Sequence, residues 1–228
     1  MLFGNDYKSN VYSQFGEDGI IQHFLDLIPK EMRTYRVIEF GAADGTFCSN
    51  TARLWLSGCE ALLIESDPVH YSKLGRFKNA RVNTLQAKVE DLEDFTSDIA
   101  DVCSIDVDGN EYQILEKLKT KHTILVVEHN PTVPPHVRMV NEPDTMQGSS
   151  ALSLTELCVG MGYTLVAATT SNLIFTYQLD VEGYEQDLEN LFDYSCLNYV
   201  VTDYHGRYNM IGRWPYGMTE ARDLGLTE

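Results

Sequence analysis

Short runs of consecutive apolar residues recur along the first 130 residues and alternate with stretches whose apolar residues repeat at helical spacing. Such runs are typical of strands buried on both faces, and the repeat indicates amphipathic helices. The runs predict strands at Val37–Phe40, Ala61–Ile64, Val82–Ala87, Val102–Ile105 and Thr123–Val127. The repeats predict helices at Glu17–Ile28, at Asn50–Leu56 after a Ser49 cap, at Asn110–Leu118, and after Asp67-Pro68, where Asp67 is the N-cap.

The second half of the chain continues with a long connection. Residues 129–150 form a proline-containing loop that is too long for a simple connector. A helix is predicted at Leu152–Met161, followed by two strands, Tyr163–Ala168 and Leu173–Tyr177, on either side of a short polar turn. Strands that alternate with helices indicate a parallel sheet with helices on both faces.

Acidic residues outnumber basic ones by 34 to 17, which gives a formal net charge of −17 at pH 7. A negative surface repels phosphate backbones and anionic lipids, so we expect no nucleic acid and no membrane as partner. No apolar run approaches the ~18 residues of a membrane span, and no signal peptide is visible at the N-terminus. The five cysteines are scattered and include no C-x-x-C pair, which fits a reducing, cytoplasmic location.

The segment Arg36–Pro68 has the element order of half a nucleotide-binding unit. A buried strand contains Glu39, a turn contains Gly41 and Gly45, and a second apolar strand ends at Glu65. A carboxylate at that second position can accept both hydroxyls of a ribose. The dinucleotide fingerprint needs G-x-G-x-x-G directly after the strand, and its third glycine is absent, which disfavours an NAD-dependent oxidoreductase.

This pattern resembles motif I and the following acidic motif of class I S-adenosylmethionine-dependent methyltransferases. Four parts of the chain are similar to the FkbM-like family, at Ser13–Asp18, Glu39–Gly45 with Ser49–Thr51, Ser104–Glu111 and Val127–Pro131. The resemblance covers about residues 12–177 and departs at Asp108, where that family more often has Glu. It implies an α/β fold with a Rossmann-like, doubly wound, seven-stranded mixed sheet whose final strand is antiparallel, and it implies S-adenosyl-L-methionine as cofactor.

The resemblance also implies which residues contact this cofactor. Gly41 and Gly45 let the backbone approach its amino-acid end, Glu65 faces the ribose, Glu90 the adenine amino group, and Asp106 the methionine end. The full expected set is Gln14, Glu39, Gly41, Ala42, Gly45, Asn50, Glu65, Ser66, Glu90 and Asp106.

Polar residues follow the fourth and fifth predicted strands, and two interpretations of their chemistry stand side by side. In one, Asp106, Asp108 and Asn130 bind Mg²⁺, because hard cations prefer oxygen ligands, and the metal lowers the pKa of a substrate hydroxyl. In the other, Asp108 caps the following helix and His129 is the general base. The residues expected to be catalytic are His129, Asp108 and Glu128.

We therefore predict methyl transfer from S-adenosylmethionine to the hydroxyl of a small molecule or sugar. The alternatives are a methyltransferase-fold protein that binds without turnover and an NAD-dependent oxidoreductase. We expect one domain over residues 1–228, with a core at about 12–178 and a tail, 179–228, that packs on the domain or covers the acceptor site. The acceptor and the oligomeric state stay open.

Overall fold

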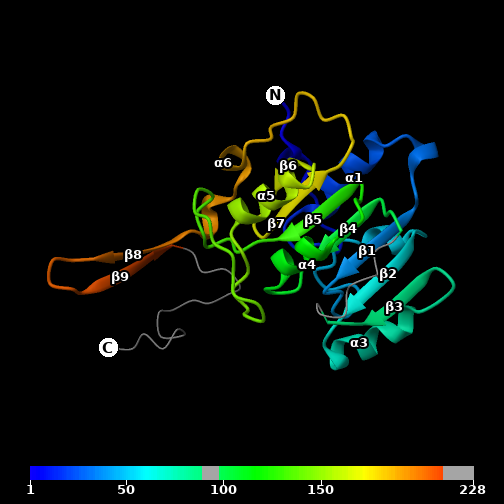
Figure 1. The fold of residues 1–228 in the computed structure, drawn as a ribbon, viewed down its shortest axis with the longest axis horizontal. Coiled ribbons are helices and arrows are strands. Elements are labelled where there is room, and N and C mark those ends of the chain that lie inside the picture. The colour runs from blue at the N-terminus through cyan, green and yellow to red at the C-terminus, as the bar shows by residue number, and fades with distance from the viewer. Residues whose placement is uncertain (89–97, 213–228) are drawn as a thin grey trace.

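The computed structural model describes residues 1–88 and 98–212, and its centre is a seven-stranded sheet (Figure 1). The strands are β1 (Arg36–Phe40), β2 (Glu60–Glu65), β3 (Val82–Gln86), β4 (Val102–Ile105), β5 (Ile124–Glu128), β6 (Thr164–Ala168) and β7 (Asn172–Thr176). Their order is β3-β2-β1-β4-β5-β7-β6, in which β1 to β5 are parallel and β7 is antiparallel to both of its neighbours. The predicted α/β fold with a mixed sheet is confirmed.

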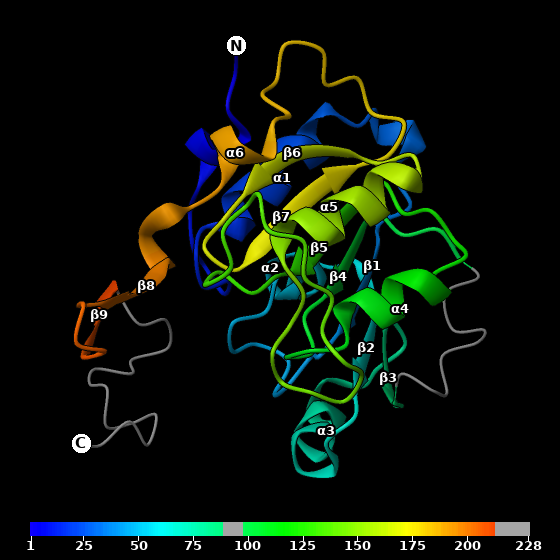
Figure 2. The same cartoon turned by 60° about the vertical axis from the view of Figure 1, so that its left-hand side comes forward.

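Helices cover both faces of this sheet (Figures 1 and 2). One face carries α1 (Glu17–Leu27), α2 (Ala52–Leu56) and α3 (Pro68–Leu74), and the other carries α4 (Glu111–Lys117), α5 (Ala151–Gly160) and α6 (Leu188–Leu191). Short 3-10 helices lie at Gly4–Tyr7, Lys30–Met32, Gly75–Phe77 and Tyr194–Cys196. Each face buries its own apolar cluster, because successive residues of a strand point to opposite sides of the sheet. The sheet is therefore doubly wound, as predicted.

The predicted boundaries of the helices and strands of this core lie within two residues of the observed ones, where both are described. Asp67 caps α3 as expected, since its carboxylate accepts the backbone N–H groups of Val69 and His70, both at 2.8 Å. The largest shift is at α2, which begins at Ala52 rather than Asn50. The residues just before α2 are held instead by hydrogen bonds to a strand-end acid, described below.

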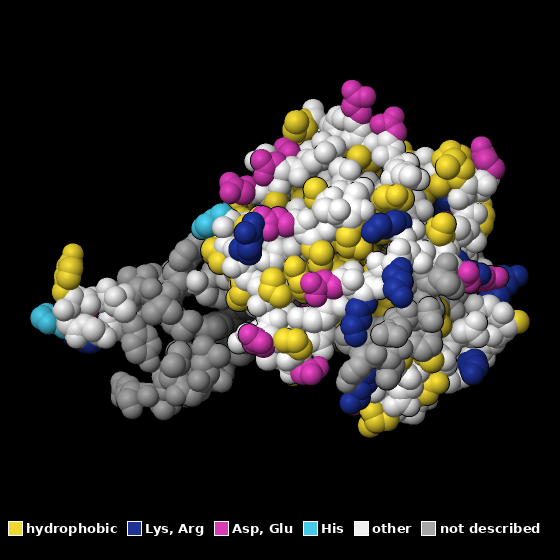
Figure 3. Space-filling model, viewed as in Figure 1, with side chains coloured by type: hydrophobic (Ala, Val, Ile, Leu, Met, Phe, Trp, Pro, Cys, Tyr) yellow, Lys and Arg dark blue, Asp and Glu magenta, His cyan; other side chains and the backbone are white. Residues whose placement is uncertain are grey.

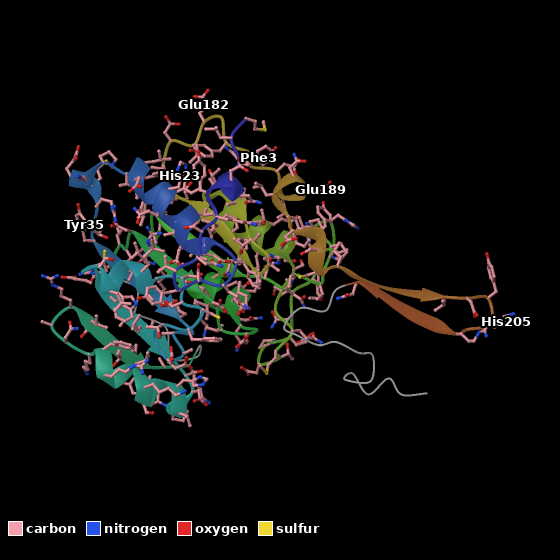
Figure 4. The ribbon with its side chains drawn as sticks, turned by 180° about the vertical axis from the view of Figure 1, so that it is seen from behind. Phe3, His23, Tyr35, Glu182, Glu189 and His205 are labelled. Carbon is pink, nitrogen blue, oxygen red and sulfur yellow. The ribbon has the colours of Figure 1, made fainter. Side chains whose placement is uncertain are left out.

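The chain after β7 first packs on the sheet and then leaves it. Leu188, Leu191 and Phe192 are buried, and the Tyr184 hydroxyl lies 2.6 Å from the ring Nε2 of His23 on α1, a helix seen in Figure 4. Beyond this segment, β8 (Asn198–Thr202) and β9 (Tyr208–Gly212) form a separate antiparallel hairpin. The hairpin projects from the body and carries His205 at its tip (Figures 3 and 4). The sequence pattern did not predict it.

Within residues 1–88 and 98–212, no helix is long and apolar enough to cross a membrane.

Candidate cofactor and acceptor site

The turn after β1 lies directly against the end of β4, which explains its first glycine. Gly41 has a φ of 77°, and a Cβ atom at this position would lie 1.6 Å from the carbonyl oxygen of Asp106. The backbone N–H groups of Gly41 and Ala42 both donate to the Ile64 carbonyl oxygen at 3.0 Å. Gly45 also has a positive φ, 92°. The turn is thus held at the carboxyl ends of β1 and β2 in a shape that favours glycine at both positions.

Glu39, near the end of β1, is buried and fully engaged by the chain itself. Its carboxylate accepts hydrogen bonds from the Ser49 hydroxyl at 2.7 and 2.9 Å, the Thr51 hydroxyl at 2.7 Å and the Asn50 backbone N–H at 2.9 Å. Burial raises the pKa of Glu39, and these donors act against that rise. The structure therefore places this predicted cofactor residue beneath the turn, where it organises the loop that leads into α2.

Glu65, at the end of β2, faces the glycine turn. Its two carboxylate oxygens accept the backbone N–H groups of Ala43 and Asp67, each at 2.8 Å. Two hydrogen bonds leave further acceptor positions on the carboxylate. Ser66, the next residue, is exposed. This is the place on the sheet where the sequence predicted a ribose contact.

The other predicted cofactor residues occupy different settings. Asn50 is buried, its amide donates to the Ser104 hydroxyl at 3.1 Å, and its carbonyl oxygen has no partner among the described residues. Gln14 is exposed on the loop before α1. Glu90 lies outside the described residues.

The loop that carries Gln14 is shaped by the two acids that follow it. Asp18 accepts the backbone N–H groups of three successive residues, 11 to 13, at 2.7 to 2.8 Å. Glu17 is fully buried and joins this loop to the β6–β7 turn, because it accepts from the Phe15 backbone and from the side chains of Thr169 and Asn172. The Ser-Gln-Phe-Gly-Glu-Asp segment is therefore a folded unit beside the strand ends, a role that the sequence alone did not reveal.

Three carboxyl groups meet at the ends of β4 and β5, and we call Asp106, Glu111 and Glu128 the carboxyl cluster. The alternation of side chains along parallel strands places Asp106 and Glu128 on the same face as Glu39. The Glu128 carboxyl lies close enough to the carboxyl groups of Asp106 and Glu111 to influence the pKa of each. Glu111, from the first turn of α4, was not predicted as a site residue.

The cluster shifts the titration of its members in one direction. Burial, with the neighbouring acids, raises the pKa of Asp106 to about 7. Burial also raises the pKa of Glu128 well above its usual range, and the charges of Asp106 and Glu111 add to this effect. The three acids are therefore harder to ionise together than separate carboxyl groups would be.

His129 points away from the carboxyl cluster. It follows Glu128 directly, so its side chain lies on the opposite face, where its ring packs against Phe192 at a centroid distance of 5.5 Å. The residue is 2% exposed, and neither ring nitrogen has a partner in the described part of the chain. Burial lowers the pKa of His129 to about 4, so the ring is neutral at pH 7. The structure does not bring it together with Glu128 as one pocket.

The predicted metal set is also divided. Asp108 is exposed, and its backbone N–H donates to Glu128 at 3.2 Å. The Asn130 side chain is used inside its own loop, where it accepts from Thr132 and donates to the Gln147 carbonyl oxygen. In residues 1–88 and 98–212, no group of three or more His, Cys, Asp or Glu side chains is placed to hold a metal ion. The structure gives the Mg²⁺ interpretation no support.

The 130–150 loop packs beside the carboxyl cluster and lies next to α4 in Figure 2. The side chains of Asn110 and Asp144 hydrogen bond at 3.2 Å, and the Asn141 amide donates to the Gly109 carbonyl oxygen. A Cβ atom on Gly109 would lie 2.0 Å from the Thr145 carbonyl oxygen. The long loop is therefore closely docked on the β4–α4 turn that carries Asp108.

The similarities found among known proteins are distant. No family model matches the chain, and no curated protein matches it. Solved structures that are similar to it include the N-terminal domain of EvdMO1 with SAH bound, with 13% identity, a TM-score of 0.48, and coverage of 72% of this chain and 81% of that one. TrmK from M. capricolum in complex with S-adenosyl-homocysteine has 12% identity, a TM-score of 0.46, and coverage of 76% and 74%. A SAM-dependent methyltransferase from Aquifex aeolicus has 13% identity, a TM-score of 0.42, and coverage of 71% and 88%.

Similarities this weak assign neither an activity nor a substrate. The strand order, the antiparallel β7 between β5 and β6, and helices on both faces define the class I methyltransferase fold.

Proposed function

We propose that this chain is an S-adenosylmethionine-dependent methyltransferase that methylates a hydroxyl group of a small molecule, such as a sugar. The observation that carries the proposal is the position of Glu65, whose carboxylate ends β2 and faces the glycine turn after β1. On a doubly wound sheet, ligands bind beyond the carboxyl ends of the strands, near the switch point between β1 and β4. The proposal includes an FkbM-like relationship and one domain.

One feature of the described residues fits the donor. The carbonyl oxygen of the buried Asn50 side chain has no partner among these residues, and a ligand could supply one. In this proposal Glu65 accepts the ribose hydroxyls and Asp106 faces the donor's ammonium group. The bound donor supplies an electrophilic methyl group on a sulfonium.

Glu128 is the base in this proposal. It lies on the same face as Asp106, whereas His129 lies on the other face and keeps a lowered pKa of about 4. The acceptor oxygen attacks the methyl carbon, the carbon–sulfur bond breaks with its electron pair moving to sulfur, and the hydroxyl proton moves to Glu128. No metal takes part in this scheme.

Production of S-adenosylhomocysteine from S-adenosylmethionine, measured with a panel of sugars and other small hydroxyl compounds, tests the proposal. We expect turnover by the wild type and its loss in Glu65→Gln. Glu60→Gln is the matched control, because Glu60 lies on the same strand but is exposed at its far end. Binding of S-adenosylhomocysteine without turnover of any acceptor would favour a binding protein, and binding of NAD in its place would favour an oxidoreductase.

We further propose a reducing, cytoplasmic location, because all five cysteines are free thiols in the structure.

A further inference from the structure

A cavity of about 330 Å³ lies between the end of α2 and the start of β3, apart from the candidate cofactor and acceptor site. Val82, which lines it, is the first residue of β3 and pairs with Ala61. Glu65 pairs with Gln86 at the other end of the same two strands. The segment that leads into β3, the edge strand of the sheet in Figure 1, forms one wall of the cavity. The cavity is therefore separate from the place where the donor is proposed to bind.

Three basic side chains line this cavity, in a chain whose formal net charge is −17. They are Arg76, Lys78 and Arg81, and none of the described lining residues is acidic. Arg76 forms an ion pair with Asp44 at 3.6 Å. Within residues 1–88 and 98–212, neither Lys78 nor Arg81 forms an ion pair. The cavity is thus a place of positive charge on an acidic molecule, and it favours an anion.

The walls also contain N–H donors that the chain leaves unused. Arg81 donates from Nη1 to the Gly58 carbonyl oxygen at 3.2 Å, whereas a guanidinium has five N–H donors in all. Trp55, from α2, lines the cavity and is 5% exposed, and its indole Nε1 has no hydrogen-bond partner in the described part of the chain. A buried N–H group without an acceptor is unfavourable, so an acceptor oxygen on a ligand would be stabilised here.

The same cavity has an aromatic part. The rings of Trp55 and Phe77 pack edge to face with their centroids 5.0 Å apart. The Arg76 guanidinium lies 4.6 Å from the centroid of the Phe77 ring, and this contact holds the cation beside the aromatic pair. A ligand that suits both parts has an anionic group and a ring. A phosphate monoester carries close to two negative charges and three acceptor oxygens, so it matches several basic side chains better than a carboxylate does.

We infer that this cavity binds a phosphate monoester of a small, ring-containing molecule. The phosphate lies against Lys78 and Arg81, the indole N–H of Trp55 donates to the ligand, and the ring of the ligand packs beside Phe77. The volume is at the lower end of the range for small-molecule sites, which limits the ligand to one or two rings. The site does not depend on the proposed function, because none of these residues belongs to the proposed cofactor or acceptor site.

The intrinsic fluorescence of the cavity provides the test. The chain has two tryptophans, Trp55 and Trp214, so Trp214→Phe leaves the cavity indole as the only one. Uridine monophosphate, uridine and inorganic phosphate are titrated into this variant, and calorimetry repeats each titration with the wild type. We expect uridine monophosphate to bind at least about tenfold more tightly than the other two, because only it has both the phosphate and the ring. Equal affinity for uridine or for inorganic phosphate, or no binding of uridine monophosphate, would overturn the inference.

Matched charge variants test the basic wall. Lys78 is exposed and forms no ion pair with a described residue, so Lys78→Gln should fold, and Arg81→Gln is the second variant. Each should weaken the binding of uridine monophosphate about tenfold and leave that of uridine unchanged. The control is Lys73→Gln, which removes the same charge from an exposed position on α3 that does not line the cavity. An equal loss in Lys73→Gln would show that the general charge of this surface, and not the cavity, holds the anion.

Two further variants test the indole and the independence of the two sites. Trp55→Phe keeps an aromatic ring, removes the N–H donor and should weaken the binding of uridine monophosphate about tenfold. Unchanged affinity would contradict the contact with the indole. Glu65→Gln should bind uridine monophosphate as the wild type does, and a loss there would place this ligand in the proposed cofactor site and overturn the inference. Absence of S-adenosylhomocysteine binding with uridine monophosphate still bound would contradict the proposed function alone.

Discussion

Acidic side chains end strands in both halves of the sheet, but their partners differ. At β1 and β2, Glu39 and Glu65 accept hydrogen bonds from hydroxyl and backbone N–H groups. At β4 and β5, Asp106 and Glu128 meet other carboxyl groups. The first arrangement fixes the shape of loops, whereas the second brings acidic groups together and raises the pKa of each. The difference teaches that the groups around a strand-end acid decide its role. Hydrogen-bond donors make the acid part of the loop structure, whereas neighbouring acids raise its pKa.

The largest effect should come from removing an acid of the first kind. Glu39→Ala should lower the free energy of unfolding by about 3 kcal/mol, because it leaves several buried donors without an acceptor. Urea unfolding measures this change. Glu60→Ala, which removes an exposed acid paired with Arg36 at 3.2 Å, is the control and should change stability by less than about 0.5 kcal/mol. A loss below about 1 kcal/mol for Glu39→Ala would show that the loop before α2 does not depend on this carboxylate.

The variant Glu65→Gln tests whether an acid that accepts backbone N–H groups can also bind a ligand. Glu65→Gln should weaken S-adenosylhomocysteine binding about 30-fold, or about 2 kcal/mol, because a charged acceptor for the ribose hydroxyls is lost. Stability should change by less than about 1 kcal/mol, since an amide oxygen still accepts one of the two backbone N–H groups. Calorimetry and urea unfolding on one sample separate the two effects. Unchanged affinity would remove Glu65 from the proposed cofactor site.

Neutralising an acid that lies among other acids should raise the free energy of unfolding and not lower it. Burial raises the pKa of Glu111, so its ionised form destabilises the fold above the unfolded pKa of about 4.5. Glu111→Gln should therefore be more stable than the wild type at pH 8, by about 1 kcal/mol, and the gain should shrink as the pH falls toward 5. Thermal unfolding across this pH range measures the gain. The control is Glu116→Gln, which removes an exposed acid from α4. A variant less stable than the wild type at pH 8 would mean that the cluster is already compensated.

A buried histidine outside both regions should make the fold less stable as the pH falls, which is the reverse of the pH dependence expected for Glu111. Burial lowers the pKa of His122 to about 4, and its Nδ1 accepts the Ala100 backbone N–H at 3.1 Å. As the pH falls, the unfolded state binds a proton on His122 before the folded state does. The stabilisation of the fold by neutral His122 is therefore complete above pH 6.5 and is lost as the pH falls toward 4, with a slope of at most about 1.4 kcal/mol per pH unit. His122→Gln should therefore lose less of its free energy of unfolding than the wild type does between pH 6.5 and pH 4. An unchanged slope would show that His122 is not the titrating group.

Much of the fold could be predicted from the sequence, because its strands are short buried runs and its helices are amphipathic. Glu39 and Glu65 could be located at strand ends for the same reason. The alternation rule could also have separated Glu128 from His129, since neighbouring residues of a strand face opposite sides. Expecting both residues to be catalytic assumed that nearness in sequence gives nearness of side chains.

Other parts of the site depended on contacts that no local pattern encodes. Glu111 joins the carboxyl cluster because the first turn of α4 folds back under the end of β4. Asn130 is used by its own loop, through Thr132 and Gln147, which lie up to 17 residues away. The β8–β9 hairpin followed a segment with little periodicity, so its pairing was not visible. In each of these cases hydrogen bonds, and not the periodicity of apolar residues, decided the arrangement.

Titration of S-adenosylhomocysteine into the purified protein by calorimetry, with and without Mg²⁺, tests the central claim most directly. The account predicts affinity in the micromolar range that Mg²⁺ does not change, that falls about 30-fold in Glu65→Gln and that is kept in Glu60→Gln. No detectable heat with the wild type in either condition would contradict the methyltransferase proposal and leave only the fold.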